Sequence, residues 1–226
     1  MKTVQSFYNE LSSQYTELIS KCVPRYGELL YNMFHYIPDD FKPKRILDLG
    51  CGTGNLTERI LKHYPEAEID ALDISEDILK ESQKRFKDKP NVRYIQADFQ
   101  KMHLPPGSYD LVLSSIAIHH IQDQEKAVLY REIFQALSTD GLFIFADQTR
   151  GITEDIYQKH IFRWKEEAFK LGSTQENWDM WMAHQDAHDF HTPVNWHLKQ
   201  LELAGFKELD VIWKNIMWAI LWARKI

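Results

Sequence analysis

The sequence of 226 residues is poor in the features that mark several classes of protein. Its two cysteines, Cys22 and Cys51, are too few for a disulfide framework and suit a reducing compartment. No apolar run approaches the roughly 18 residues that a membrane span needs, and the first residues lack the apolar core of a signal peptide. We therefore expect a cytoplasmic protein with no membrane partner.

The sequence also lacks an excess of positive charge. Its 27 Lys and Arg residues are outnumbered by 33 Asp and Glu, which gives a formal net charge of −6. A nucleic-acid binder needs a basic surface to neutralise phosphates, so this balance argues against nucleic acid as the main partner. Apolar residues make up 44% of the chain, which is ordinary for a folded domain with a sizeable core.

Short apolar runs alternate with helical patterns through the middle of the chain. The predicted strands cover 45–49, 67–74, 92–97, 109–115 and 142–147, and the predicted helices cover 53–63, 75–86, 124–137 and 194–204. This alternation predicts an α/β fold, a doubly wound Rossmann-like sheet that is mostly parallel. Two closing runs, 207–213 and 216–223, are separated by two residues, which predicts an antiparallel hairpin and seven strands in all.

Two helical segments flank or interrupt this pattern. Residues 1–40 carry apolar residues at helical spacing with a break at Pro24, and residues 149–193 are helix-like and rich in Trp and His. We expect a single domain over residues 1–226, with 1–40 as an N-terminal helical cover and 149–193 as a helical lid insert. Residues 41–148 and 194–226 would then form the core.

The most informative segment is the glycine-rich turn DLGCGTG at residues 48–54. It follows the first predicted strand, and Gly50 and Gly52 permit a tight turn and a close approach by a ligand. Its glycine spacing differs from the G-x-G-x-x-G of dinucleotide sites, and Asp48 suits a ligand with a cationic group. By itself such a turn is equally typical of an ordinary helix entry.

Two further acids follow the next predicted strands. Asp73 ends the second strand, where a carboxylate can bind ribose hydroxyls. Asp98 ends the third strand and offers an acceptor for an adenine amino group, with the aromatic Phe99 beside it. Each acid alone is more often a plain strand-end residue, but three in succession favour a nucleoside site.

Five segments carry a resemblance to a known family: DLGCGTGNL (48–56), ALDIS (71–75), ADF (97–99), YDLVLSS (109–115) and GLFIFAD (141–147). They resemble the class I S-adenosylmethionine-dependent methyltransferases. The resemblance implies S-adenosyl-L-methionine as cofactor and S-adenosyl-L-homocysteine as product. The cofactor contacts that it implies come from Asp48, Gly50, Cys51, Gly52, Asp73, Ile74, Asp98, Phe99 and Ser115.

The two ends of the chain are similar to one branch of that family. FYNELSSQYTELISKCVPRY (7–26) and GFKELDVIWKNIMWAILWARK (205–225) resemble the carboxy-S-adenosylmethionine synthases, which implies a cofactor contact from Tyr26 and a homodimer. Tyr26 is equally typical of helix packing. The turn reads CGTG instead of a CSLG-like sequence, and Gln200 stands where those synthases hold the extra carboxylate with arginine. We therefore expect ordinary S-adenosylmethionine as the cofactor.

Two histidines follow the fourth predicted strand, on the lip that faces the acceptor in this family. The sulfonium of the cofactor is already activated, so a general base is needed only when the acceptor must lose a proton. By resemblance to the phosphoethanolamine methyltransferases, His120 is the predicted base and His119 the second candidate. Histidines at this place also occur across the family as backbone caps.

The lid insert holds a second group of histidines. His184, His188 and His191 follow i, i+4, i+7 spacing and could share a helix face with Asp186 or Asp189, which is a pattern seen in metal sites. Related lids carry such histidines without a metal, so we predict no metal.

The predicted function is transfer of a methyl group from S-adenosylmethionine to an O, N or S atom of a small-molecule acceptor. One alternative is an enzyme related to tRNA modification, either like the carboxy-S-adenosylmethionine synthases or a tRNA methyltransferase. The other is a non-catalytic S-adenosylmethionine-binding protein.

Overall fold

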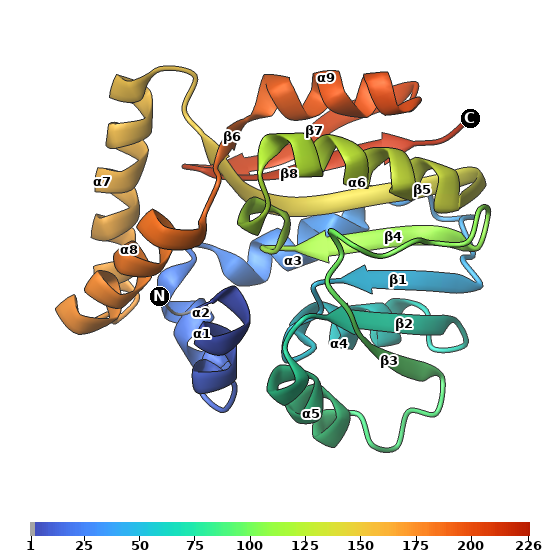
Figure 1. The fold of residues 1–226 in the computed structure, drawn as a ribbon, viewed down its shortest axis with the longest axis horizontal. Helices are drawn as coiled ribbons and strands as arrows, with labels where there is room; N and C mark the ends of the chain where they lie inside the picture. The colour runs from blue at the N-terminus through green and yellow to red at the C-terminus, as the bar shows by residue number, and fades with distance from the viewer. Residues whose placement is uncertain (1–2) are drawn as a thin grey trace.

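A mixed sheet forms the centre of the protein in the computed structural model, which describes residues 3–226 (Figure 1). Its strands lie in the order β3-β2-β1-β4-β5-β8-β7, and β6 pairs with β5 off this path. In chain order they are β1 (Arg45–Leu49), β2 (Glu68–Asp73), β3 (Val92–Gln96), β4 (Tyr109–Ser115), β5 (Leu137–Arg150), β6 (Thr192–Pro193), β7 (Glu208–Asn215) and β8 (Trp218–Arg224). β1 to β5 pair in parallel, and β8 runs antiparallel to β5 and β7. The predicted doubly wound fold with its antiparallel hairpin is confirmed.

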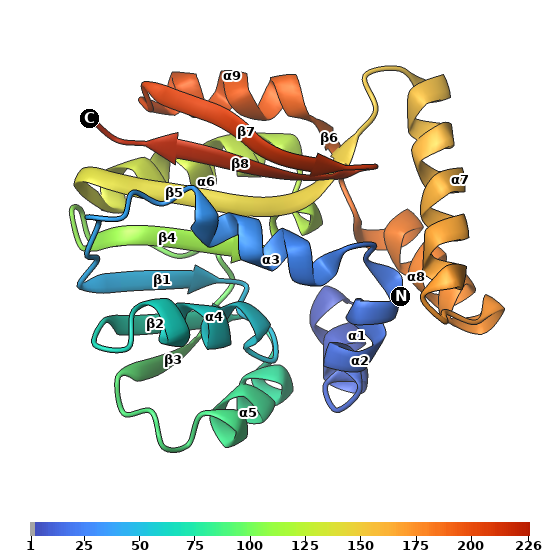
Figure 2. The same cartoon turned by 180° about the vertical axis from the view of Figure 1, so that it is seen from behind.

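Helices cover both faces of this sheet. They are α1 (Val4–Leu11), α2 (Tyr15–Cys22), α3 (Tyr26–His35), α4 (Asn55–His63), α5 (Glu76–Arg85), α6 (Asp123–Ala136), α7 (Glu154–Lys170), α8 (Gln175–His188) and α9 (Val194–Ala204), with a short 3-10 helix η1 (Ile118–His120). α6 and α9 lie on one face, and α3 and α4 lie on the other (Figures 1 and 2). Within residues 3–226, none of these helices is long and apolar enough to cross a membrane.

The alternation of side chains along the central strands separates two hydrophobic cores. In β1, Ile46 packs into the core that α3 and α4 share, while the next residue, Leu47, packs into the core beneath α6 and α9. Both residues are fully buried. Neighbouring residues of a strand point to opposite faces, so a strand covered on both sides is mostly apolar on both, and the buried Asp48 is an exception in β1. This is why the centres of β4 and β5, residues 111–113 and 142–146, read as continuous apolar runs.

Two local predictions differ from the structure. The N-terminal segment before Pro24 forms two helices instead of one, because residues 12–14 turn the chain between α1 and α2. The hairpin turn lies at Ile216 and Met217, with Asn215 paired to Trp218, and so is two residues later than expected. Ile216 has a φ of 54°, a left-handed conformation that the side chain alone does not favour. The prediction therefore missed the turn position because it relied on polar residues.

The helices of the cover lie beyond the carboxyl ends of the parallel strands. In Figure 1, α1, α2, α7 and α8 gather on the side toward which the arrows of β1 and β4 point. Trp164 of α7 is 2% exposed and joins these parts, since its indole Nε1 donates a hydrogen bond to the Cys22 carbonyl at 2.7 Å. Its ring also contacts Trp178 of α8 and Trp218 of β8, with centroids 4.8 and 5.4 Å apart. The division of the chain into core and cover stays a prediction.

We predict that Trp164→Phe destabilises the protein by about 1–3 kcal/mol, because it leaves the buried Cys22 carbonyl without that donor. Trp213→Phe is the matched control: its indole donates to Glu28 at 2.9 Å in an exposed position where water can replace it. The control should change stability by no more than about 0.5 kcal/mol. Urea unfolding of both variants measures this, and equal losses would contradict the role given to the buried bond.

Candidate active site

A cavity of about 330 Å³ lies where β1, β2 and β3 end, enclosed on one side by α1. Residues predicted from the sequence form much of its wall: Gly50, Gly52, Asp73, Ile74, Asp98, Phe99 and His120. The rest comes mainly from the N-terminal helices and the turn after β4: Thr3, Val4, Gln5, Tyr8, Tyr15, Ile78, Gln100, Ile116, Ala117 and Ile121. The topology thus brings most of the predicted site to one end of the sheet.

The glycine turn after β1 is held against the neighbouring strand. The backbone N–H groups of Gly50 and Cys51 both donate to the Leu72 carbonyl, at 2.8 and 2.9 Å. Gly50 has a φ of +74°, and a Cβ added there would lie 2.4 Å from the Cβ of Ala117. Only glycine fits this position, because any side chain would collide with the turn after β4 and occupy the cavity.

Two carboxylates border the cavity at the ends of β2 and β3. Asp73 accepts hydrogen bonds from the backbone N–H of Gly52 and of Ser75, each at 2.9 Å, which fixes its orientation. Burial raises the pKa of Asp73, and these backbone donors lower it in part. Asp98 is more open, and its carboxylate accepts from the Gln100 N–H at 3.0 Å. The two acids therefore present remaining acceptor capacity to the cavity.

Asp48 lies beneath the turn and not on the cavity wall. It is fully buried, and its Oδ2 accepts a hydrogen bond from the Thr57 hydroxyl at 2.6 Å. Its Oδ1 has no hydrogen-bond partner, and burial raises the pKa of Asp48 to about 7. A buried acceptor without a partner is costly and would be satisfied by a donor or a positive charge placed beside the turn.

Three other predicted contacts also lie off the cavity wall. Tyr26 begins α3, and its hydroxyl accepts from Asn55 at 3.3 Å, so it supports the start of α4 behind the turn. Cys51 is buried in the turn itself, where burial raises the pKa of its thiol. Ser115 ends β4 with a buried hydroxyl that has no hydrogen-bond partner.

His119 is fixed by the carboxylate at the end of the GLFIFAD segment. Its Nδ1 lies 2.5 Å from Asp147 Oδ1, and its backbone N–H donates to Asp147 Oδ2 at 2.9 Å. Burial lowers the pKa of His119, but the carboxylates of Asp147 and Asp189 outweigh it and raise the pKa overall. Its ring is 3% exposed and does not line the cavity.

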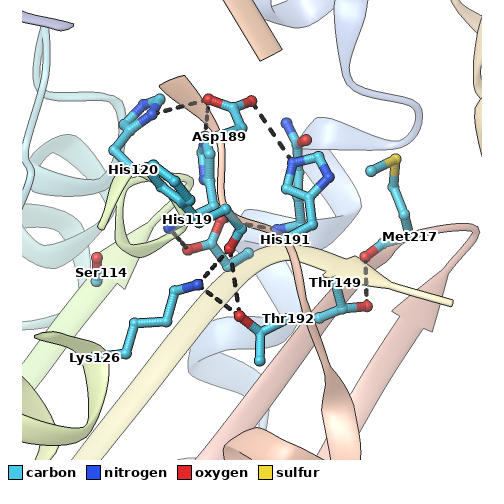
Figure 3. Close-up of polar contacts among 12 residues, drawn as sticks. Ser114, His119, His120, Lys126, Thr149, Asp189, His191, Thr192 and Met217 are labelled. Atoms are coloured by element: carbon cyan, nitrogen blue, oxygen red, sulfur yellow. Dashed lines mark hydrogen bonds and ion pairs between the residues drawn. The ribbon is translucent and has the colours of Figure 1, made fainter. Parts of the chain in front are cut away.

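His120 does line the cavity, and both of its ring nitrogens have neighbours. Nε2 lies 2.9 Å from the Tyr8 hydroxyl of α1. Nδ1 lies 3.0 Å from Asp189 Oδ1 at the end of α8, a contact that Figure 3 shows. Burial lowers the pKa of His120, and the nearby His119 lowers it further. The N-terminal cover and the lid therefore meet on this one imidazole.

The lid histidines do not share one helix face. α8 ends at His188 and Asp189 is its C-cap, so His191 lies beyond the helix on the segment that leads to β6. The expected i, i+4, i+7 arrangement is therefore wrong. Instead, His184 and His191 approach different oxygens of Asp189, Oδ1 at 3.7 Å and Oδ2 at 3.6 Å.

Residues 46–141, which contain the glycine turn, Asp73 and Asp98, match the methyltransferase domain family. This part of the chain is therefore a methyltransferase domain. A malonyl-[acyl-carrier protein] O-methyltransferase of Halalkalibacterium halodurans is 35% identical over 137 residues, which cover 59% of this chain and 46% of that protein. The chain spans about half the length of the curated relatives it matches.

Solved methyltransferases share the fold. An S-adenosylmethionine-dependent methyltransferase from Mesorhizobium loti superimposes with a TM-score of 0.61 and 24% identity, over 85% of this chain and 95% of that one. A phosphoethanolamine N-methyltransferase of Haemonchus contortus, bound to phosphomonomethylethanolamine and S-adenosylhomocysteine, gives a TM-score of 0.70 at 14% identity, over 100% of this chain and 61% of that one. These structures show the fold, and the family match over residues 46–141 confirms the prediction of a methyltransferase.

Sequence reasoning missed several residues around the site of the methyltransferase domain. Tyr8 and Tyr15 lie in the segment whose similarity suggested Tyr26, but a single sequence does not reveal which tyrosine faces inward. Asp147 belongs to a quoted motif and Asp189 to the lid group, yet neither was linked to the histidines after β4. These contacts join residues that are tens of positions apart, so local patterns do not indicate them.

The raised pKa of Asp48 makes a prediction about stability and pH. The folded protein keeps this proton up to about pH 7 while an unfolded Asp loses it near pH 4, so ionisation of Asp48 costs stability as pH rises. Asp48→Asn should therefore gain stability relative to the unchanged protein by up to about 4 kcal/mol between pH 4 and pH 8. Urea unfolding at several pH values measures the difference. Asp77→Asn, at an exposed pair with Lys80, is the control, and a gain that does not vary with pH would contradict the prediction.

Proposed function

We propose that this chain binds S-adenosyl-L-methionine in the cavity beside the glycine turn and transfers its methyl group to an O, N or S atom of a small molecule. The observation that carries the proposal is the cavity itself. One end holds the glycine turn and two carboxylates, and the other holds Tyr8 and His120 from the cover and from the loop after β4. Its volume suits a small ligand.

The residues present fit this cofactor. Asp73 and Asp98 offer acceptors for ribose hydroxyls and an adenine amino group, and the ring of Phe99 offers an apolar wall for the base. Gly50 and Gly52 leave room for close approach. The unpartnered oxygen of Asp48 lies beneath the same turn, where the cationic end of the cofactor would balance its charge. Ile74 adds to the wall, while Tyr26, Cys51 and Ser115 would act from behind it.

Ordinary S-adenosylmethionine fits better than the carboxylated form. Within residues 3–226, no Lys or Arg lines the cavity, so the wall offers no fixed cation for a second carboxylate. Gln200 lies on α9, away from the wall. The same lack of lysine and arginine gives no support to the tRNA alternative, which needs phosphate contacts beside the site.

The bound cofactor supplies an activated methyl group, and the protein's task is to orient the acceptor and exclude water. The cover does both, because α1 closes the cavity and brings the Tyr8 hydroxyl to His120. We propose that the acceptor binds against this pair. A general-base role for His120 stays a prediction, as do a homodimer and a cytoplasmic location. His119, held by Asp147, would keep the loop in place.

We predict that Asp73→Ala weakens binding of S-adenosylhomocysteine by at least tenfold, since it removes charge-assisted hydrogen bonds worth about 1.5–3 kcal/mol. Asp77→Ala is the matched control, an acid four residues further on that pairs with Lys80 on the surface. Isothermal titration of both variants tests the assignment. Unchanged affinity in Asp73→Ala would place the cofactor elsewhere.

Transfer itself is tested with labelled S-adenosylmethionine and a metabolite extract, followed by identification of the labelled product. We predict that His120→Ala lowers the rate of label transfer at least tenfold while it retains S-adenosylhomocysteine binding. His103→Ala, at a site that is 91% exposed, is the control. Turnover without any loss in His120→Ala would remove His120 from the acceptor site, and cofactor binding without turnover on any acceptor would favour the non-catalytic alternative.

A further inference from the structure

Four imidazoles surround the carboxylate of Asp189, which is 5% exposed. Three of them approach one oxygen, Oδ1: His120 Nδ1 at 3.0 Å, His119 Nε2 at 3.7 Å and His184 Nε2 at 3.7 Å. His191 Nε2 lies 3.6 Å from the other oxygen, Oδ2. Figure 3 shows Asp189 between His120 and His191, with His119 close by.

Most of these contacts are too long for hydrogen bonds, and many of the atoms have no other partner. His120 Nδ1 and Asp189 Oδ1 form a close ion pair at 3.0 Å, but both ring nitrogens of His184 are buried without a hydrogen-bond partner, and His191 Nε2 comes no closer than 3.6 Å to Asp189. Buried polar atoms are nearly always paired in native proteins, so a group of them around one point indicates a missing partner. Each neutral imidazole offers one nitrogen lone pair and the carboxylate offers only acceptor oxygens, so a cation is a partner that suits the group.

The spacing fits a metal ion. Two ligands at usual Zn²⁺ distances on a tetrahedral ion lie about 3.4 Å apart, and the separations of Asp189 Oδ1 from His120 and His119 fall on either side of that value. The ligand atoms of these three residues all lie within 4.8 Å of one another. Small side-chain movements would therefore bring all three to one ion.

In His119 and His120, the ring nitrogen that faces away from Asp189 has a hydrogen-bonding neighbour, as is usual for metal-binding histidines. His119 Nδ1 contacts Asp147 at 2.5 Å, which leaves the lone pair on Nε2, the atom that faces Asp189. His120 Nε2 contacts the Tyr8 hydroxyl at 2.9 Å, and donation to that oxygen leaves the lone pair on Nδ1. Such outer partners fix the tautomer and orientation of a ligating imidazole.

We infer that His119 Nε2, His120 Nδ1 and Asp189 Oδ1 form a binding site for one divalent first-row transition metal ion, with Zn²⁺ as the reference. Two imidazoles and one carboxylate leave at least one position of a tetrahedral ion open. His120 lines the active-site cavity, whereas His119 and Asp189 line a small pocket behind it that shares Tyr8 and Tyr15, so the ion would lie next to the acceptor end. This differs from the sequence-based prediction of no metal, which considered only the lid histidines.

A metal ion here would give the acceptor end the positive charge that the wall lacks. Bound to an acceptor oxygen or nitrogen, it would lower the pKa of that group and hold it toward the methyl donor. This part rests on the proposed function, whereas metal binding by itself does not. The metal site and the general-base role are alternatives for His120, because an imidazole that ligates a metal does not serve as a general base.

The test uses the full chain purified without a His tag, stripped with a chelator and titrated calorimetrically with ZnCl₂. We expect one ion per chain, and at least a tenfold loss of affinity in both His120→Ala and Asp189→Asn. His188→Ala is the matched control, since His188 is the last residue of α8, next to Asp189, and is not one of the three proposed ligands. The d–d absorption of added Co²⁺ provides a second readout of imidazole and carboxylate ligation.

Thermal unfolding and S-adenosylhomocysteine titration of each variant show whether it is folded. No stoichiometric binding by the unchanged chain, or equal affinity in all three variants, would overturn the metal site. If the unchanged chain binds Zn²⁺ but not S-adenosylhomocysteine, the metal site is supported and the proposed function is rejected. If the unchanged chain binds S-adenosylhomocysteine but not Zn²⁺, the metal site is rejected and the proposed function is unaffected.

Discussion

The buried carboxylate of Asp189 is the group on which the closed end of the molecule depends. It lies at the C-terminus of α8 and contacts the two histidines that follow β4, which joins the lid to the core. Next to it, the Phe190 N–H donates to the His119 carbonyl at 2.7 Å, and Lys126 donates to the Phe190 carbonyl. A charge is tolerated in such a place only when other groups compensate it. The lid and the loop after β4 are therefore positioned together.

The active-site cavity has two parts that are built from different elements. The end that suits a nucleoside is built from strand ends and the glycine turn, which the sheet holds rigidly through bonds such as Gly50 N–H to the Leu72 carbonyl. The opposite end depends on helices held by a few large side chains: Tyr8 of α1 contacts His120 in the loop after β4, and Trp164 of α7 contacts Trp218 of β8. A rigid cofactor end can be kept while the cover varies, which suits a fold used with many acceptors.

Much of the fold and the cofactor end could be predicted because local chemistry determines them. The bounds of β1, β4 and α9 agree with the expected residues, since each is an apolar or amphipathic run with a clear stop such as Gly205. Ser75 caps α5, with its hydroxyl accepting from the Ile78 N–H at 3.2 Å, at the place where the helix was expected to begin. The hairpin turn was misplaced because Ile216 adopts a left-handed conformation that its residue type does not indicate.

The acceptor end could be predicted only in part. His120 was expected to face it, and it lines the cavity, but its partners Tyr8 and Asp189 lie 112 positions before it and 69 positions after it in the chain. The i, i+4, i+7 spacing of the lid histidines suggested one helix face, whereas the helix ends before the third of them. A helical spacing has meaning only within a helix, and where this helix ends depends on the contacts of Asp189 and Phe190 with the core.

The sequence by itself determined the doubly wound sheet, the glycine turn and the acids at the strand ends. These follow from side-chain periodicity and backbone conformation within a few neighbouring residues. Only the tertiary structure decided which tyrosines face the cavity, that Asp48 supports the turn from beneath, and that four histidines converge on Asp189. Those relations depend on how helices from the two ends of the chain pack over one edge of the sheet, which no local spacing specifies.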